Sequence, residues 1–248
     1  MKSLSEKFQI QNYDTVTSTN TLLKEQAEAG APDGTVIIAK HQTAGRGRLG
    51  RSFYSPADTG LYMSVLLRPN LKIEEALLLT TATAVAVSDA IETVTGEQTA
   101  IKWVNDIFCH GKKVCGILTE AVPDLETGKL QYAVIGIGVN LLPPKEGFPD
   151  ELQSVATSVC DCETHQIATL AEEILNQLSV YLEHLPEKTF LEDYQKKCFL
   201  IGKEVIVLPG NKKATVLGID DEVGLMVQFP DGTQTTLRTG EVRVMVEK

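Results

Sequence analysis

The stretch GRGRLGR, residues 45–51, decides between two fold classes, because its glycine spacing formally matches the G-x-G-x-x-G loop of a dinucleotide-binding fold. In that fold the third glycine opens a helix, and an acidic residue follows about 20 positions later. Here Gly50 is followed by RSFYSP, residues 51–56, which does not begin an amphipathic helix. The stretch therefore disfavours a nicotinamide or flavin site and indicates a glycine-hinged loop that carries three arginines.

Three guanidinium groups on mobile backbone suit a small phosphorylated ligand, since each offers a planar fork of donors. A solvated loop whose arginines pair with surface acids is the alternative that this stretch alone leaves open. Asp plus Glu outnumber Lys plus Arg by 33 to 23, which gives a formal net charge of -10. This balance opposes general binding to DNA or to an anionic membrane, so the basic cluster is a local feature.

The composition is that of an ordinary globular protein, with 43% hydrophobic and 23% charged residues in a chain of 248. This length accommodates one large domain and a small one. The N-terminal MKSLSEKFQI lacks a signal-peptide core, and no run approaches the ~18 apolar residues expected of a membrane span. We expect a cytoplasmic protein that does not bind membranes.

The five cysteines are odd in number and form no C-x-x-C pair, so a disulfide framework is not expected. Cys160 and Cys162, with His165, offer metal-ligand chemistry, but a fourth ligand of suitable spacing is missing. The alternative for this segment is a polar surface loop.

Hydrophobic periodicity predicts strands and helices on both sides of the arginine loop. Helices are expected over residues 18–27, 73–95 and 167–182 and after Pro186. Strands are expected over residues 36–39, 61–67, 101–103, 114–119 and 132–139.

The hydrophobicity pattern of the sequence changes near Gly202: from there on, five short apolar runs alternate with turn sequences. These runs occupy residues 205–208, 214–219, 225–229, 234–237 and 242–246. Their even spacing predicts a small barrel of about 45 residues. We therefore expect a catalytic domain over residues 1–200 and a barrel over residues 201–248.

Two further segments carry residues suited to phosphate chemistry: KWVND at 102–106 and KKVCGIL at 112–118. Strand alternation is expected to place Lys113, Cys115 and Ile117 on one face, with Gly116 permitting close approach of another group. A lysine here can meet a carboxylate, and Asp106 can hold magnesium or orient a ribose. A simply solvated lysine is the alternative.

The ordered motifs resemble those of the biotin protein ligase family over nearly the whole chain. They are STN at 18–20, QTAGRGR at 42–48, SP at 55–56, KWVND, KKVCGIL, and GIGVN at 136–140, followed by TGEV at 239–242. Phe53 stands where the family usually has Trp, and Val104 where it usually has Pro. Only some ten residues precede the catalytic region, which predicts a form without the DNA-binding domain that many relatives carry.

The resemblance implies an α+β fold: a mixed central β-sheet flanked by helices, of the class II synthetase-like biotin/lipoate ligase type, then a small SH3-like β-barrel. It implies that biotin and ATP, with Mg2+, form biotinyl-5'-AMP and pyrophosphate. A lysine of a biotin carboxyl carrier protein domain of a carboxylase then attacks the mixed anhydride. A lipoate-protein ligase-like enzyme and a non-catalytic biotin-responsive regulator are the alternatives. A homodimer through exposed strand edges is also compatible with the sequence.

The resemblance also assigns residues to roles. The predicted catalytic cations are Arg48, Lys113 and Arg46. The predicted biotin contacts are Ser18, Thr19, Asn20, Gln42, Gly45, Arg46, Gly47, Arg48, Lys113 and Gly116. The predicted nucleotide contacts are Arg48, Arg51, Phe53, Lys102, Asn105, Asp106 and Asn140, with Asp106 as the magnesium ligand.

Overall fold

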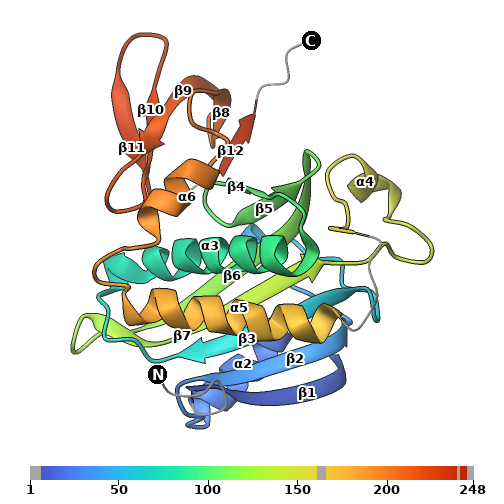
Figure 1. Cartoon of the computed structure of the whole chain (residues 1–248). Helices are drawn as coiled ribbons and strands as arrows, with labels where there is room; N and C mark the ends of the chain where they lie inside the picture. The colour runs from blue at the N-terminus through green and yellow to red at the C-terminus, as the bar shows by residue number, and fades with distance from the viewer. Residues whose placement is uncertain (1–6, 161–165, 239–240, 245–248) are drawn as a thin grey trace.

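The computed structural model describes residues 7–160, 166–238 and 241–244. These residues form a seven-stranded sheet with helices on both faces and a separate five-stranded sheet near the C-terminus (Figure 1). The large sheet has the order β1-β2-β3-β7-β6-β5-β4, in which β1 and β2 run parallel and the other neighbours antiparallel. The predicted fold class, a mixed sheet flanked by helices and followed by a small β module, is confirmed.

The large sheet comprises β1 (Gln9–Val16), β2 (Thr35–Gln42), β3 (Gly60–Leu67), β4 (Ala100–Lys102), β5 (Asp106–Cys109), β6 (Lys112–Asp124) and β7 (Lys129–Asn140). The helices are α2 (Thr19–Glu28), α3 (Ala76–Thr95), α4 (Asp150–Gln153), α5 (Gln166–Glu183) and α6 (Leu191–Lys197), with 3-10 turns η1 (Arg48–Gly50) and η2 (Ile73–Glu75). Every helix and strand expected in this part of the chain is present. The sequence patterns missed β1, β5 and α4, because β1 is a mostly polar edge strand and the other two span only four residues each.

The small sheet has the order β11-β10-β9-β8-β12 and is antiparallel throughout its described pairs. Its strands are β8 (Glu204–Leu208), β9 (Lys212–Ile219), β10 (Leu225–Gln228), β11 (Gln234–Leu237) and β12 (Glu241–Val244). All five predicted strands are therefore present, although the expected end of the last one at Val246 lies outside the described residues. The division of the chain into domains at residues 200 and 201 stays a prediction.

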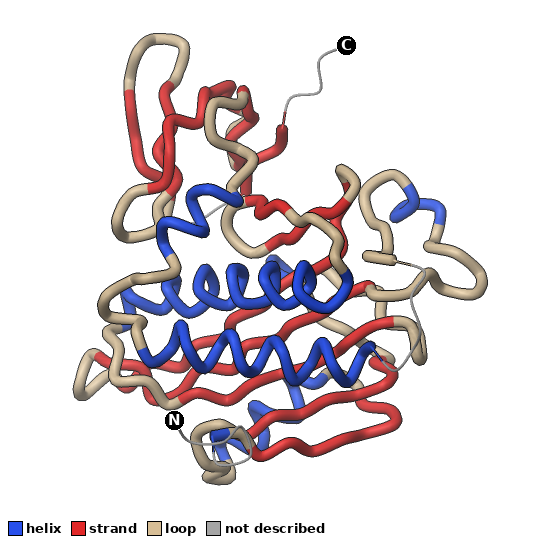
Figure 2. The backbone as a smooth tube through the Cα atoms, in the orientation of Figure 1, coloured by secondary structure: helices blue, strands red, loops and turns tan. Residues whose placement is uncertain are grey.

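Helices cover both faces of the large sheet, as the tube in Figure 2 shows. On one face, α3 and α5 pack against a core that includes Val36 and Val65. On the other face, α2 packs against Ile37 and Leu66, the next residues along the same two strands. Because successive strand side chains point to opposite faces, burial on both sides requires the mostly apolar runs seen in β2 and β3.

The segment Ile73–Thr95 is long and apolar enough to cross a membrane, with a mean hydropathy of 1.4 over its most apolar window. The expectation that no run reaches this length is therefore wrong. Of that window, 72% is buried inside the protein, between the sheet and neighbouring helices. A helix that is apolar on most of its faces is explained by this position in the core.

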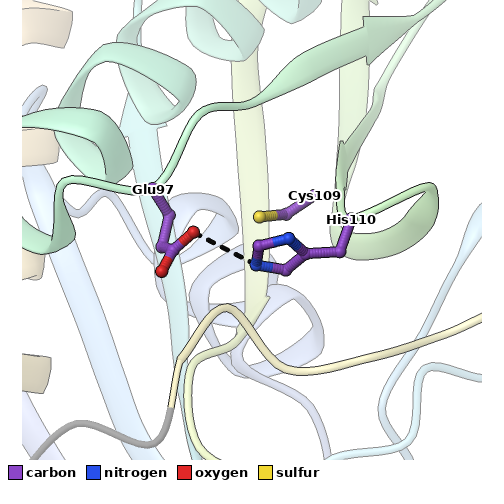
Figure 3. Close-up of side chains that lie close together, drawn as sticks. All are labelled: Glu97, Cys109 and His110. Atoms are coloured by element: carbon purple, nitrogen blue, oxygen red, sulfur yellow. Dashed lines mark ion pairs between the residues drawn. The ribbon is translucent and has the colours of Figure 1, made fainter.

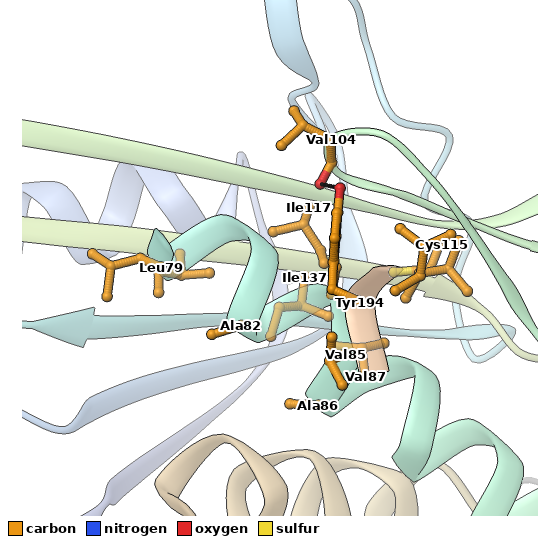
Figure 4. Close-up of a cluster of buried hydrophobic side chains, with 14 of the residues drawn as sticks. Leu79, Ala82, Val85, Ala86, Val87, Val104, Cys115, Ile117, Ile137 and Tyr194 are labelled. Atoms are coloured by element: carbon orange, nitrogen blue, oxygen red, sulfur yellow. Dashed lines mark hydrogen bonds between the residues drawn. The ribbon is translucent and has the colours of Figure 1, made fainter. Parts of the chain in front are cut away.

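The KWVND turn between β4 and β5 is held by contacts from two distant parts of the chain. The indole Nε1 of Trp103 donates a hydrogen bond to the carbonyl of Val223, 2.9 Å away, in the small-sheet region. The hydroxyl of Tyr194, on α6, donates to the carbonyl of Val104 at 3.1 Å (Figure 4). Burial raises the pKa of Tyr194 well above its ordinary value, so this hydroxyl stays a neutral donor.

We expect Tyr194→Phe to lower the free energy of unfolding by about 1–3 kcal/mol, because it leaves the buried Val104 carbonyl without its donor. Urea unfolding followed by far-ultraviolet circular dichroism measures the change. The matched control is Tyr13→Phe, whose half-buried hydroxyl bonds to the side chain of Gln11. Equal stability of the two variants would contradict a structural role for the Tyr194 bond.

Candidate active site

Three adjoining cavities of about 920, 120 and 20 Å³ lie around the arginine loop and the neighbouring ends of β6 and β7. We call them the large, middle and small cavities. Phe53 lines all three, and Lys113 lines the large and middle ones. Every predicted site residue except Gly45 lines at least one of them, so the fold gathers the motifs in one region. The chemical roles assigned to these residues remain predictions.

The small cavity contains a buried hydroxyl that lacks a partner. Ser18 precedes α2 as its N-cap residue, but its side chain makes no capping bond. Its Oγ is buried and has no hydrogen-bond partner among the described residues. Beside it, both the backbone N and the Oγ1 of Thr19 donate to Oε1 of Gln42, at 2.9 and 3.2 Å. Buried polar atoms are normally paired, so the Ser18 hydroxyl indicates a ligand position.

A polar network below this cavity reaches the arginine loop. Ser64 Oγ lies 2.7 Å from Thr19 Oγ1 and 2.6 Å from Asn20 Oδ1. Asn20 Nδ2 donates to Oε2 of Glu120 at 3.0 Å, and Nη1 of Arg46 donates to the same oxygen at 3.0 Å. Ser64 and Glu120 were not predicted as site residues. The available signal was weak: Ser64 is a polar residue within the apolar strand β3, and Glu120 is one of several polar residues in β6.

Three glycines on neighbouring strands form the floor of the middle and small cavities. A Cβ on Gly136 would collide with the amide of Asn20, and one on Gly138 would lie 2.6 Å from Cε1 of Phe53. A Cβ on Gly116 would lie 3.1 Å from the Lys113 ammonium. Glycine in a strand interior indicates close approach of another group, and this signal in GIGVN was available from the sequence.

The arginine loop folds back on itself, so that its two ends run antiparallel and pair with each other. The amide N of Phe53 donates to the carbonyl of Gly45 at 2.9 Å, and Gly47 N donates to the Arg51 carbonyl at 2.7 Å. Leu49 occupies the exposed tip, with a positive φ of 56°. Residues after Gly50 continue in extended conformation, which confirms that this stretch does not open a helix.

Arg48 lies over the middle cavity, where a buried amide holds it. Its Nη1 donates to Oδ1 of Asn105 at 2.8 Å, and Asn105 Nδ2 in turn donates to the Ile117 carbonyl at 2.8 Å. Asn105 is only 9% exposed, so its orientation is fixed by these two bonds. The β4–β5 turn therefore aims a guanidinium group at the cavity through one rigid side chain.

Lys113 forms an ion pair with Asp106, with Nζ 2.6 Å from Oδ1. The two side chains are 32% and 23% exposed, so water still reaches the pair. Its role is mainly geometric, since partly exposed pairs contribute little to stability. It holds the ammonium between the middle and large cavities, above Gly116.

The expectation that Lys113 shares a strand face with Cys115 and Ile117 is wrong. The pairing of β5 with β6 shifts at this point: Ile107 lies opposite Cys115, whereas Phe108 lies opposite Lys113. The extra residue in β6 is a β-bulge, which reverses the alternation of faces along the strand. Cys115 and Ile117 consequently enter the core, while Lys113 remains on the cavity side with Gly116.

Cys115, in the KKVCGIL motif, does not supply a reactive thiolate to this site. Cys115 is fully buried, and burial raises the pKa of its thiol far above the ordinary value. Cys109, Cys115 and Cys198 are free thiols. Cys160 is disulfide-bonded, a single bridge that the sequence patterns did not predict. The rest of the suggested metal cluster, Cys162 and His165, lies outside the described residues.

The large cavity combines cationic and aromatic walls. Its cationic lining residues are Arg51, Lys102, Lys113 and Arg243. Asp106 is the one carboxylate among its described lining residues. Asn140 also lines the cavity, and its Nδ2 donates to the Thr157 carbonyl at 3.4 Å. Aromatic rings of Phe53, Tyr54, Phe108, Phe148 and Phe199 complete the wall. Such a cavity suits a ligand with both a planar ring and several negative charges.

Comparison with known proteins identifies the class to which this fold and site belong. The model of the Biotin/lipoate A/B protein ligase family matches residues 13–140. The chain is 38% identical over 229 residues to the Bifunctional ligase/repressor BirA of Bacillus spizizenii, covering 88% of this chain and 69% of that protein. It is 31% identical over 234 residues to the Biotin--[acetyl-CoA-carboxylase] ligase of Mycobacterium tuberculosis, covering 91% and 85% of the two chains.

Solved structures give the same relationship. Biotin protein ligase from Aquifex aeolicus in complex with biotin and ATP superposes with a TM-score of 0.78 at 27% identity, covering 96% of this chain and 99% of that one. The chain belongs to the biotin/lipoate A/B protein ligase family, and within that family it is similar to biotin protein ligases.

We expect Glu120→Gln to accelerate tryptic cleavage within the arginine loop, because the neutral amide no longer pairs with Arg46. A partly exposed pair contributes up to about 1 kcal/mol, which corresponds to roughly a fivefold increase in cleavage rate. Mass spectrometry of the fragments over time measures it. Glu126→Gln, at an exposed position beyond the same strand, is the control. Cleavage of both variants at the rate of the unaltered protein would show that Glu120 does not hold the loop.

Proposed function

We propose that this chain is an ATP-dependent biotin protein ligase that forms biotinyl-5'-AMP and transfers biotin to a lysine of a biotin carboxyl carrier protein domain of a carboxylase. One observation carries the proposal: a small cavity with an unpartnered hydroxyl leads, past Arg48 and Lys113, into a large cationic and aromatic cavity. The relatives named as biotin ligases, and the Aquifex aeolicus structure with biotin and ATP, support it.

The small cavity supplies the groups that a ureido ring requires. That ring presents two N–H donors and one carbonyl acceptor at fixed angles. Ser18 Oγ can donate to the carbonyl or accept from an N–H, and Oε1 of Gln42 is an acceptor held in place by Thr19. Asn20 uses its amide within the supporting network, so it orients the cavity. The Phe53 ring above Gly138 must shift for the rest of the ligand to lie on the glycine floor.

The middle cavity is where the biotin carboxylate meets the α-phosphate. Two anions repel, so bond formation depends on cations aimed at the charge that develops on the phosphoryl oxygens. Arg48 reaches this position from the loop, and Lys113 reaches it from β6. As a carboxylate oxygen attacks phosphorus, the bond to the β-phosphate oxygen breaks and pyrophosphate leaves. Arg46, fixed by Glu120, adds charge at the biotin end.

The large cavity is suited to the nucleotide. Lys102 and Arg51 line its phosphate side, and its aromatic rings offer a stacking surface for adenine. Asp106 and Asn140 are the oxygen donors that would hold Mg2+ here; a single carboxylate with substrate phosphates fits the usual magnesium environment. When bound, the ion neutralises phosphate charge. The ion pair with Lys113 keeps the Asp106 carboxylate directed into the cavity.

The acyl-adenylate must be shielded from water until the acceptor lysine arrives, and the arginine loop is placed to cover it. In the second step the lysine amine attacks the biotinyl carbonyl, and AMP leaves. We further propose that the small sheet forms a separate domain from about residue 201, that the protein acts in the cytoplasm, and that β1, at the edge of the large sheet, allows a homodimer.

Transfer of radiolabelled biotin to a purified carrier domain tests the proposed function. We expect transfer that requires ATP and Mg2+ and that is lost when the acceptor lysine is replaced by Arg. The same assay with lipoate in place of biotin separates the two branches of the family. Preferential transfer of lipoate, or pyrophosphate exchange that depends on neither acid, would contradict the proposal.

We expect Arg48→Ala and Lys113→Ala each to slow biotin-dependent ATP–pyrophosphate exchange by roughly a hundredfold, or about 3 kcal/mol of transition-state stabilisation. Lys112→Ala is the matched control, because that neighbouring side chain is exposed and binds the Gln153 carbonyl instead. An exchange rate within about twofold of the unaltered protein for either cavity variant would exclude that residue from the adenylation step.

We also expect biotin and ATP together to protect the arginine loop, residues 45–53, from trypsin. The acyl-adenylate would bridge Arg48 and the small cavity and so reduce opening of the loop. Fragment analysis with biotin alone, ATP alone and both together measures this effect. Protection no greater with both ligands than with neither would show that the loop does not close on the intermediate.

A further inference from the structure

Glu97, Cys109 and His110 bring three different metal-ligating side chains together at the rim of the large cavity. Their ligand atoms all lie within 4.8 Å of one another. Nε2 of His110 lies 3.1 Å from Oε2 of Glu97, and the Cys109 thiol is buried beside them. Figure 3 shows the carboxylate, the sulfur and the imidazole pointing toward one another. None of these residues belongs to the predicted reaction centre.

The backbone places the three groups from two separate segments. Glu97 lies in the linker between α3 and β4, directly after the Gly96 C-cap. Cys109 ends β5, and His110 begins the two-residue turn that leads to β6. His110 and Gly111 both have positive φ, 51° and 75°, as a tight type I' hairpin turn requires. The turn thereby directs the imidazole back toward the linker and not along the strand.

The donor set favours one kind of metal. A thiolate, an imidazole and a carboxylate together are typical ligands of Zn2+, whereas Mg2+ and Ca2+ prefer oxygen ligands alone. In a tetrahedral site with Zn–ligand distances of about 2.0–2.3 Å, the ligand atoms lie about 3–4 Å apart. The three ligand atoms here already lie within 4.8 Å of one another, so small side-chain movements would complete that geometry. Glu97 and His110 are 36% and 61% exposed, so an ion can enter from solvent, and a water molecule can complete four-coordination.

We propose that Glu97, Cys109 and His110 form a binding site for Zn2+, separate from the Asp106 position. The ion would tie the α3–β4 linker to the β5–β6 hairpin. That hairpin continues directly into Lys113, and Cys109 and His110 line the large cavity. The site thus stabilises one wall of the large cavity without contacting the reacting atoms. Zinc binding depends only on these three side chains and not on the proposed ligase activity.

Metal titration of the chelator-treated, full-length protein tests the site. We expect one Zn2+ per chain by isothermal titration calorimetry. Co2+ is expected to give a thiolate-to-cobalt charge-transfer band and the intense visible bands of tetrahedral coordination. The thermal unfolding midpoint should rise with Zn2+, because binding to the folded state stabilises it. Absence of stoichiometric binding would overturn the proposal.

Variants identify the ligands. His110→Asn keeps a residue that the type I' turn favours while removing the imidazole, and it should weaken Zn2+ binding by more than about tenfold. Glu97→Gln should do the same, and Cys109→Ser should abolish the charge-transfer band. The control is Cys160→Ser combined with Cys162→Ser, which should leave binding unchanged. Zn2+ binding that survives unchanged in the first three variants would refute this site.

Discussion

The architecture of the candidate active site depends on the lack of side chains at Gly116, Gly136 and Gly138. On adjacent strands β6 and β7, these residues leave bare backbone where any Cβ would meet a functional group. Asn20 and Phe53 occupy the space above β7. Backbone that carries no side chain is also the surface on which a thin, extended ligand can lie flat. The glycines therefore determine both the depth of the site and the positions of the side chains around it.

Electrostatics then determine what the site can bind. The chain as a whole is acidic, with a formal net charge of -10, yet the described walls of the large cavity contain four Lys or Arg side chains and one carboxylate. That carboxylate, Asp106, forms an ion pair with Lys113. Guanidinium groups on the loop and the Lys113 ammonium group on β6 also line the middle cavity. A local concentration of positive charge in an acidic protein favours a small polyanion over nucleic acid.

Much of the fold and of the candidate site could be predicted from the sequence, because the signals for them were local. The apolar runs of β2 and β3, the long buried helix α3 and the five strands of the small sheet follow from periodicity and turn residues. The motifs also identified the residues that line the cavities. β1 was missed because most of its residues are polar, so its sequence does not alternate regularly between apolar and polar positions. Ser64 and Glu120 were missed because a polar residue in a strand does not reveal which residue it will contact. The face of Lys113 was wrong because a bulge depends on pairing with β5.

The sequence by itself determined the types of chemical group available and the elements that carry them: hinged arginines, a lysine beside a strand glycine, and a hydroxyl at the start of a helix. Only the tertiary structure decided which of these groups meet. It joined Arg46 to Glu120 and left the Ser18 hydroxyl without a partner among the described residues. It also held the KWVND turn through Tyr194 and Trp103. Finally, it brought Glu97 close to Cys109 and His110. The physical reason is that these contacts span strands and helices far apart in the chain, and register, bulges and packing set their geometry.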